Sequence, residues 1–284
     1  MRTGWIEVSN FKQIENAIVE IDEKGKLLLY GPNGSGKSSL IQAFASLLSH
    51  ISEDVNAKKV LSRLLPESLQ SFIRFGADRA VVSAEIDDKR FRLEIDRRTG
   101  VALHVDGERG EARLRLSLSY VAPCSVGNSL VEDLLDVDLC PPGISIRNAE
   151  VAEWVRSKLY LLGLEDVYLN VVKERGRWID MQHLACGFVR VFGLLLAAYG
   201  EPDVLIADSF ETGLHYDLAV DVIEFLTSLP SFVILESHIG LSVKAALKRG
   251  WSVYYVKEGE FVRISNMDEL KKIAYAEARA FAEA

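Results

Sequence analysis

The stretch Gly31-Pro32-Asn33-Gly34-Ser35-Gly36-Lys37-Ser38 has the pattern G-x-x-x-x-G-K-[ST], which is typical of a loop that binds the phosphates of a nucleotide. The apolar run at residues 27–30 directly before it predicts a strand buried on both faces. Residues 38–48 after it carry apolar side chains at helical spacing. Because the pattern lies between a strand and a helix, we interpret it as a phosphate loop and not as a chance glycine-rich turn.

Each part of the loop has a chemical role. Glycines let the backbone curl so that its N–H groups point at phosphate oxygens, and the following helix presents its positive N-terminal end. We expect Lys37 to reach the β- and γ-phosphates and the Ser38 hydroxyl to bind Mg²⁺, so ATP and Mg²⁺ are the predicted cofactors. The residues expected to bind the nucleotide in this segment are Asn33, Gly34, Ser35, Gly36, Lys37, Ser38 and Ser39.

Composition narrows the class of protein. The chain has 284 residues, of which 49% are hydrophobic and 26% charged, so a sizeable folded core is expected. No apolar stretch has the length of a membrane span and the N-terminus lacks a signal-peptide core, which predicts a cytoplasmic protein without a membrane partner. The net charge of −8 argues against wholesale non-specific binding of nucleic acid, but it leaves room for a local basic groove. The three cysteines, Cys124, Cys140 and Cys186, lack metal-ligand spacing and are expected to be small buried residues.

The pattern of apolar residues predicts a single α/β domain over residues 1–284, with a mixed, largely parallel core sheet, helices packed on it and an added antiparallel β-meander. Its first part, residues 1–120, is expected to hold two short strands at 4–8 and 17–21, the phosphate loop, and the meander at 80–86, 90–95 and 101–105. Eight basic and seven acidic residues lie between Asp87 and Arg115, which indicates a solvated surface of mixed charge.

The rest of the chain divides at residue 180. Residues 121–180 are predicted to be an irregular loop with one short helix up to 147, holding Pro141, Pro142 and Gly143, followed by a helix at 149–162. In residues 181–284 the predicted helices are at 189–199, 218–226 and 268–282, the last with Asn266 as a possible N-cap. Predicted strands are at 203–208 and 232–235, followed by a hairpin at 251–256 and 260–264. No heptad run is long enough for a coiled coil.

A second acidic position completes the predicted metal site. Asp208 ends the apolar strand at 203–208, so its carboxylate is expected to hold Mg²⁺ beside Ser38. The run Asp208-Ser209-Phe210-Glu211-Thr212-Gly213-Leu214-His215 resembles the D-E-P-E-T-G-L-H run of ABC-type ATPases of the SMC, RecF and OLD-like group. Three other segments are similar to this group: Asn10-Phe11-Lys12, Ile73-Arg74-Phe75-Gly76-Ala77, and Glu236-Ser237-His238, which resembles the switch-histidine loop.

The resemblance implies a homodimer in which two heads enclose two ATP molecules and a signature loop of one head touches the γ-phosphate held by the other. The candidate signature residues are Ala185, Cys186 and Gly187, within a run that departs from the usual L-S-G-G or L-S-S-G form; an ordinary helix start is the alternative. His238 is expected to contact the γ-phosphate, with a structural histidine as the alternative. Phe11 and Lys12 are expected to flank the adenine or its phosphates.

Two departures from the family pattern concern catalysis. Ser209 stands where the group normally has its catalytic Glu, so hydrolysis is expected to be slow unless another acid substitutes. Glu211 is the candidate substitute, and a purely structural role in the dimer loop is its alternative. The usual Mg²⁺-facing Gln is absent near residues 120–125, where Ser125 is a weak substitute.

These observations predict an ABC-type ATPase that binds and hydrolyses ATP and dimerises head to tail, in DNA repair, recombination or chromosome maintenance. The alternatives are a slow-turnover nucleotide switch or scaffold that acts through a partner protein, and a defence-type, OLD-like ATPase. The possible link to DNA rests on the resemblance and not on a basic stripe. A GTPase is disfavoured because the chain has no N-K-x-D motif.

Overall fold

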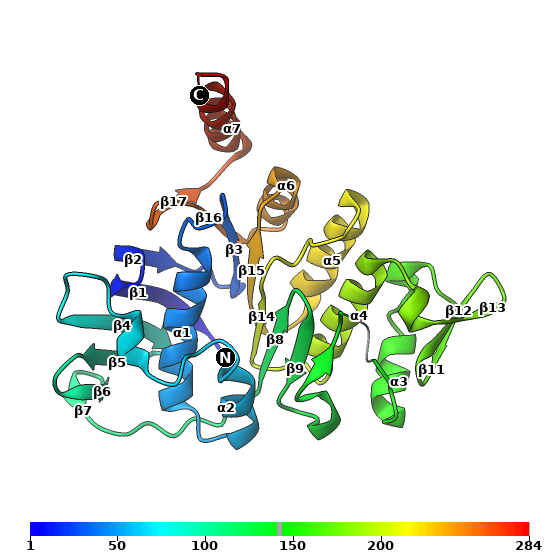
Figure 1. Cartoon of the computed structure of the whole chain (residues 1–284), viewed down its shortest axis with the longest axis horizontal. Coiled ribbons are helices and arrows are strands. Elements are labelled where there is room, and N and C mark those ends of the chain that lie inside the picture. The colour runs from blue at the N-terminus through cyan, green and yellow to red at the C-terminus, as the bar shows by residue number, and fades with distance from the viewer. Residues whose placement is uncertain (141–143, 284) are drawn as a thin grey trace.

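A computed structural model of the chain describes residues 1–140 and 144–283, so the predicted loop residues Pro141, Pro142 and Gly143 lie outside the described part. Two large β-sheets form the body of the protein, one antiparallel and one central and largely parallel; one helix lies between them, and three further helices cover the other face of the central sheet (Figure 1). The two hydrophobic clusters that result lie on opposite faces of the central sheet.

The central sheet has eight strands. They are β3 (Lys26–Tyr30), β8 (Leu118–Ala122), β9 (Ser125–Asn128), β10 (Val137–Asp138), β14 (Val204–Ala207), β15 (Phe232–Ser237), β16 (Ser252–Lys257) and β17 (Glu260–Ile264). Their order is β10-β9-β8-β14-β15-β3-β16-β17, in which β8, β14, β15, β3 and β16 are parallel and the outer strands antiparallel. The predicted mixed, largely parallel core sheet is confirmed.

The second sheet is antiparallel and carries the predicted meander. Its strands are β1 (Thr3–Phe11), β2 (Ile14–Glu20), β4 (Arg79–Ile86), β5 (Lys89–Asp96), β6 (Gly100–Val105) and β7 (Glu108–Arg109), in the order β2-β1-β4-β5-β6-β7. Helix α1 (Lys37–Ile51) lies between this sheet and the central one, because its apolar residues are buried nearly all round. The first half of the chain thus fixes α1, and with it the phosphate loop, between two sheets.

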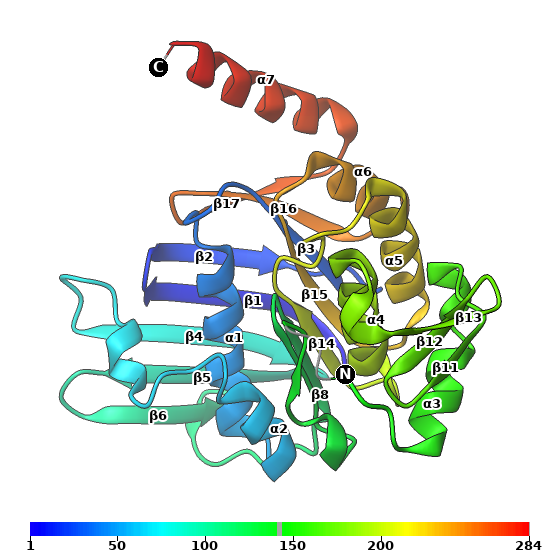
Figure 2. The ribbon, with the colours of Figure 1, turned by 45° about the vertical axis from the view of Figure 1, so that its right-hand side comes forward.

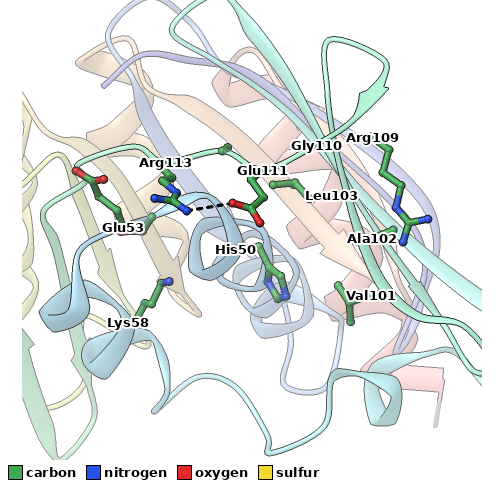
Figure 3. Close-up of a pocket in the computed structure, with 12 residues that line it drawn as sticks. His50, Glu53, Lys58, Val101, Ala102, Leu103, Arg109, Gly110, Glu111 and Arg113 are labelled. Carbon is green, nitrogen blue, oxygen red and sulfur yellow. Dashed lines mark hydrogen bonds and ion pairs between the residues drawn. The ribbon is translucent and has the colours of Figure 1, made fainter.

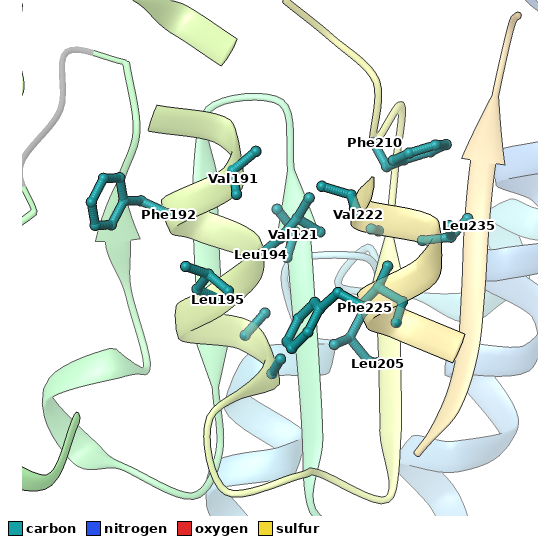
Figure 4. Close-up of a cluster of buried hydrophobic side chains, with 14 of the residues drawn as sticks. Val121, Val191, Phe192, Leu194, Leu195, Leu205, Phe210, Val222, Phe225 and Leu235 are labelled. Atoms are coloured by element: carbon teal, nitrogen blue, oxygen red, sulfur yellow. The ribbon is translucent and has the colours of Figure 1, made fainter. Parts of the chain in front are cut away.

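The other face of the central sheet is covered by α4 (Cys186–Ala198), α5 (Tyr216–Ser228) and α6 (Gly240–Lys248). Figure 4 shows Leu194 of α4 and Val222 of α5 packed against Val121, Leu205 and Leu235 of the sheet. Beyond α4 lie α3 (Ala149–Arg156) and a small sheet of β11 (Asp166–Tyr168), β12 (Val171–Glu174) and β13 (Arg177–Asp180). The C-terminal helix α7 (Met267–Glu283) leaves the body after β17 (Figure 2). Asn266 caps it, as predicted, because its Oδ1 accepts hydrogen bonds from the N–H groups of Asp268 and Glu269.

Several sequence-based predictions need correction. The mainly irregular segment predicted at 121–147 contains short strands that were not predicted: the end of β8, which pairs with β14 in the core sheet, and β9 and β10, which extend that sheet. The helix predicted at 149–162 ends at Arg156 and is followed by a 3₁₀ turn at Leu159–Leu162. The small sheet of β11 to β13, helix α2 (Val55–Leu61) and α6 were not predicted. The remaining 3₁₀ turns are at Leu69–Phe72, Glu132–Leu134 and Met181–His183.

The cysteines are also placed differently from the prediction. Cys124, Cys140 and Cys186 are all exposed, because they lie in a hairpin turn, after the last residue of β10 and at the first position of α4. Among the described residues, none of the helices combines the length and the apolar character needed to cross a bilayer.

Candidate nucleotide-binding site

The phosphate loop is held against the β16–β17 hairpin. Gly31 has φ 153°, and a Cβ at this position would clash with the carbonyl oxygen of Val256. Only glycine therefore fits where β3 runs into the loop. The Gly259 N–H donates a hydrogen bond of 2.8 Å to the carbonyl of Ser35 and fixes the middle of the loop. The Ser35 hydroxyl is buried with no hydrogen-bond partner among the described residues, as expected of a cradle shaped for a further polar group.

Lys37, the first residue of α1, turns back into this cradle. Its side chain is 2% exposed, and its Nζ donates hydrogen bonds to the carbonyl oxygens of Gly31 at 2.9 Å and Pro32 at 2.8 Å. Glu236 Oε1 lies 3.5 Å from the same Nζ. Burial lowers the pKa of Lys37, and the neighbouring Glu236 carboxylate opposes that shift. The ammonium group is thus bound by weak carbonyl acceptors that a phosphate oxygen can replace.

Two carboxylates lie at the ends of neighbouring parallel strands. Asp208 directly follows β14, and Glu236 is the fifth residue of β15, which pairs with β14 on one side and with β3 on the other. Ser38 Oγ donates a hydrogen bond of 2.9 Å to Glu236 Oε2, and Ser209 Oγ donates one of 3.1 Å to Asp208 Oδ1. Burial raises the pKa of Glu236 to about 7, and the nearby Asp208 acts in the same direction.

This donor set suits Mg²⁺. Hydroxyl and carboxylate oxygens are the ligands that this ion prefers, and it usually takes one or two carboxylates together with substrate phosphates. Within residues 1–140 and 144–283, no group of three or more His, Cys, Asp or Glu side chains is arranged as a complete metal site. The Ser38 hydroxyl and the Asp208 carboxylate are of the ligand types that this ion takes, so their predicted role stays a prediction that the chemistry of the site supports.

The loop after β14 is tied to the loop after β15. Glu211 is 9% exposed, and its Oε1 accepts a hydrogen bond from the backbone N–H of His238, while its Oε2 is buried with no hydrogen-bond partner in the described part of the chain. His238 Nδ1 lies 3.0 Å from the carbonyl oxygen of Gly31 and 3.4 Å from Lys37 Nζ. The structure thus brings Glu211, His238 and the phosphate loop into one connected group.

The candidate signature residues form the start of α4. Ala185 is the N-cap residue, Cys186 begins the helix, and both are exposed. Gly187 packs against the loop after β14, where a Cβ on Gly187 would stand 2.5 Å from the carbonyl oxygen of Gly213. One turn further on, the buried guanidinium of Arg190 donates hydrogen bonds to the carbonyl oxygens of Ala122 and Asp208. The start of α4 is therefore positioned by the same loop that carries Asp208 and Glu211.

Comparison with known proteins places this arrangement in a fold group. Residues 6–130 match a protein-family model described as an AAA domain, whereas comparison with curated protein sequences gave no significant match. A solved SMC head bound to the C-winged helix domain of ScpA has a TM-score of 0.62 at 14% identity, covering 95% of this chain and 100% of that chain. The SMC head domain from Thermotoga maritima has a TM-score of 0.58 at 16% identity, covering 93% of this chain and 99% of that chain. The recombination mediator protein RecF-ATP has a TM-score of 0.56 at 12% identity, with the same two coverages.

The chain has the fold of an SMC- or RecF-type ATPase head. The resemblance predicted from the sequence is confirmed at this level, and so is the predicted fold class. The matches extend over nearly the whole length of this chain and of each solved head.

One predicted nucleotide contact of the head is wrong. The side chain of Phe11 is 0% exposed and packs on Phe72 with ring centroids 4.8 Å apart, so it cannot stack on adenine. Phe11 ends β1 and points into the core between the sheets. Lys12, the next residue, is exposed, and its Nζ donates to Gln42 Oε1 on α1 at 2.8 Å, which leaves it on the rim of the site. Ser39 is buried, with its Oγ 3.4 Å from Gln13 Oε1.

Two polar residues of the head were missed as site residues. The sequence resemblance places Glu236 only within the switch loop, although a carboxylate near the end of the apolar run 232–235 repeats the pattern that identifies Asp208. Arg190 is the only charged residue in the apolar helix predicted at 189–199, and a lone charge there is a signal for a buried polar contact. Both could have been found by asking what a charged group does in an otherwise apolar element.

Two hollows in the surface of the head differ in character. One, of 660 Å³, lies beside the phosphate loop and is lined by Pro32, Asn33, His238 and Ile273, among others. The other, of 810 Å³, lies between α1, β6 and the segment after β7, and Figure 3 shows Glu111 and Arg113 of that segment joined by an ion pair. Its lining mixes acidic and basic side chains, in line with the mixed-charge surface predicted for this region.

Proposed function

We propose that the head binds ATP with Mg²⁺ in the loop of residues 31–38. The observation that carries this proposal is the convergence of Lys37, Ser38 and Asp208, from three separate segments, on one edge of the central sheet. In open α/β sheets, ligands bind outside the carboxyl ends of the parallel strands, and β3, β14 and β15 all end there. Lys37 exchanges its carbonyl acceptors for phosphate oxygens, while Ser38 and Asp208 hold the metal, which supplies charge neutralisation when bound.

We further propose that ATP joins two copies of the head. The exposed start of α4 offers backbone N–H groups and a helix N-terminus, which favour an anion. Within one chain, α4 packs on β8 and β9, and two strands, β14 and β15, separate β8 from β3. The phosphate that Ala185, Cys186 and Gly187 receive is therefore that of a second copy, and each copy completes the site of the other.

Hydrolysis is proposed to be slow. Ser209 cannot accept a proton from water as a carboxylate does, and its hydroxyl is engaged by Asp208. Glu211 is the proposed substitute: its Oε2 has no hydrogen-bond partner among the described residues, and the Glu211 carboxylate interacts electrostatically with Lys37. His238, whose ring lies beside Gly31 and Lys37, is positioned to contact the γ-phosphate.

The biological setting follows by analogy with proteins of this fold. A role in DNA repair, recombination or chromosome maintenance is proposed because the similar structures are SMC heads and the recombination mediator RecF. One of those SMC heads is bound to ScpA, so a protein partner is an equally direct expectation for this head. A nucleotide switch that acts through such a partner is the second candidate, and Ser209 in place of a catalytic carboxylate is the observation that favours it.

Light scattering of the purified protein with ATP and Mg²⁺, with ADP and Mg²⁺, and without nucleotide tests the proposed dimer. We expect the mass to double with ATP only, and Lys37→Ala to remain monomeric. An unchanged mass in a sample that binds ATP would exclude the dimer model. A turnover assay with and without DNA then separates a DNA-directed ATPase, which DNA stimulates, from a switch that reads another partner.

A further inference from the structure

Glu236 lies between Asp208 and the phosphate loop in the nucleotide site of one chain. Strand β15 lies between β14, which leads to Asp208, and β3, which leads to the phosphate loop. The Glu236 side chain is 4% exposed, and its two oxygens contact different groups: Oε2 accepts from Ser38 Oγ at 2.9 Å, and Oε1 lies 3.5 Å from Lys37 Nζ and 3.7 Å from His238 Nε2. All three contacts are to residues that the proposed function assigns to nucleotide or metal.

We propose that Glu236 is a positioning residue that makes nucleotide binding depend on Mg²⁺: it orients the Ser38 hydroxyl for the metal and repels a nucleotide that arrives without one. This inference rests on the proposed function, because it concerns the same site. It assigns Glu236 no direct contact with the reacting atoms.

The orienting part follows from the geometry of a hydroxyl group. Ser38 has one proton and two lone pairs, and the proton is donated to Glu236 Oε2. The lone pairs therefore point away from Glu236 and stay available to a cation. A hydrogen bond from a ligand to a buried acceptor behind it fixes the ligand's orientation and typically contributes about 10- to 100-fold to metal affinity.

The repelling part follows from charge. Asp208 and Glu236 lie on adjacent parallel strands, about 4.8 Å apart in such a sheet, and both face the edge where the phosphates are expected. Two carboxylates beside a triphosphate are unfavourable unless a divalent cation lies between them. Glu236 also competes for Lys37, because a metal-free phosphate must take this ammonium away from a carboxylate that has no new cation to bind.

The test is to measure nucleotide affinity with and without the metal. Binding of a fluorescent ATP analogue would be titrated in excess Mg²⁺ and in EDTA for the wild type, Glu236→Gln, Glu236→Asp and Glu211→Gln. For Glu236→Gln we expect the affinity for the nucleotide without metal to rise at least about tenfold, because the repelling charge is gone. The ratio of the nucleotide affinity with Mg²⁺ to the affinity without metal should fall by more than about tenfold, because the orientation of Ser38 for the metal is also weakened. Glu211→Gln removes the same charge from a side chain that contacts neither Ser38 nor Lys37 directly, so its ratio should change less.

Glu236→Asp separates the two parts of the proposal. It keeps the charge but withdraws the carboxylate from Ser38, so metal-free binding should stay weak while Mg²⁺-bound affinity falls; it also serves if Glu236→Gln does not fold. A wild-type ratio in Glu236→Gln, or in Glu236→Asp where only that variant folds, would overturn the inference. Failure of the wild type to bind ATP with Mg²⁺ at all would instead overturn the proposed function, so the two failures are distinguishable.

Discussion

Gly187 and Gly213 lie against each other where the start of α4 meets the loop after β14. A Cβ on Gly187 would be 2.5 Å from the carbonyl oxygen of Gly213, and a Cβ on Gly213 would be 3.1 Å from Cys186 Sγ. The same loop contains Glu211, which accepts the hydrogen bond from the backbone of His238 beside the phosphate loop. Continuous contacts therefore run from the candidate signature to the nucleotide site of the same chain.

This contact predicts that Gly187→Ala weakens dimerisation more than nucleotide binding. The added methyl group meets backbone and not a flexible side chain, so α4 or the loop must move, at a cost of about 1–3 kcal/mol. The exposed residues Ala185 and Cys186 move with it directly, whereas the phosphate loop is affected only indirectly, through the hydrogen bond between Glu211 and His238. Light scattering with ATP and an affinity measurement on the monomer would check the two effects separately.

Gly110→Ala is the matched control, because nothing lies within 4 Å of a Cβ at that position. We expect it to dimerise as the wild type does. Normal ATP-dependent dimerisation of Gly187→Ala would show that the start of α4 is not part of the interface.

The catalytic position after Asp208 can be tested by restoring the acid. Ser209→Glu places a carboxylate where the resembled ATPases have their general base, and we expect turnover to rise at least about tenfold, since a general base contributes about 10² to 10⁴. Ser209 already has a left-handed backbone, with φ 46°, so the change of side chain introduces no new backbone strain. A steady-state phosphate-release assay measures the effect, with Ser209→Gln as a control of similar size and no basicity. Equal rates in all three proteins would show that a missing base at residue 209 does not limit hydrolysis.

The sequence predicted the site best where a motif and an apolar element coincide. The strand at β3, the glycine loop and α1 are consecutive in the chain, so local patterns define all three. Asp208 could be predicted for the same reason, because a carboxylate ends a run of residues that are all buried. In the structure Lys37, Ser38 and Asp208 lie on one edge of the sheet, as that reasoning requires.

The missed features depend on contacts between distant segments. Strand β8 has proline and glycine after it, which suggested a loop, but pairing with β14 places it in the core. The motif at Phe11 predicts a contact with the nucleotide, whereas packing on Phe72, 61 residues away, buries the Phe11 side chain. The role of Glu236 depends on its contacts with Ser38 and Lys37, and no local sequence pattern reveals which side chains a strand residue will face.

The two possible roles of Glu211 give different results in two variants. Glu211→Gln keeps an oxygen that can accept the hydrogen bond from His238 but removes the basic carboxylate; Glu211→Ala removes both. If Glu211 activates water, we expect Glu211→Gln to lower turnover by about 10² or more and to prolong the ATP-bound dimer. Single-turnover hydrolysis and dimer lifetime after dilution would measure this. Wild-type turnover in Glu211→Gln, together with a loss in Glu211→Ala, would leave Glu211 only the role of holding the His238 loop.

Lys26, at the start of β3, predicts a pH dependence of stability. Its side chain is buried, and its Nζ donates hydrogen bonds to the carbonyl oxygens of Leu229 and Ser231. Burial lowers the pKa of Lys26 from 10.5 to about 8. Between these two values the unfolded chain holds a proton that the folded protein has released, so the contribution of Lys26 to the free energy of unfolding rises with pH across this window. Below about pH 8 the full cost of burying the charged amine is present.

Urea unfolding of the wild type and of Lys26→Met at pH 7.5, 9 and 10 tests this contribution. We expect the wild type to gain stability relative to Lys26→Met as the pH rises, because only the wild type releases the proton. Lys24→Met makes the same substitution at an exposed side chain and controls for changes elsewhere in the protein. A stability of the wild type, measured relative to Lys26→Met, that stays constant or falls as the pH rises would contradict the lowered pKa. A rise would identify Lys26 as a buried amine that the start of β3 retains at a cost in stability at neutral pH.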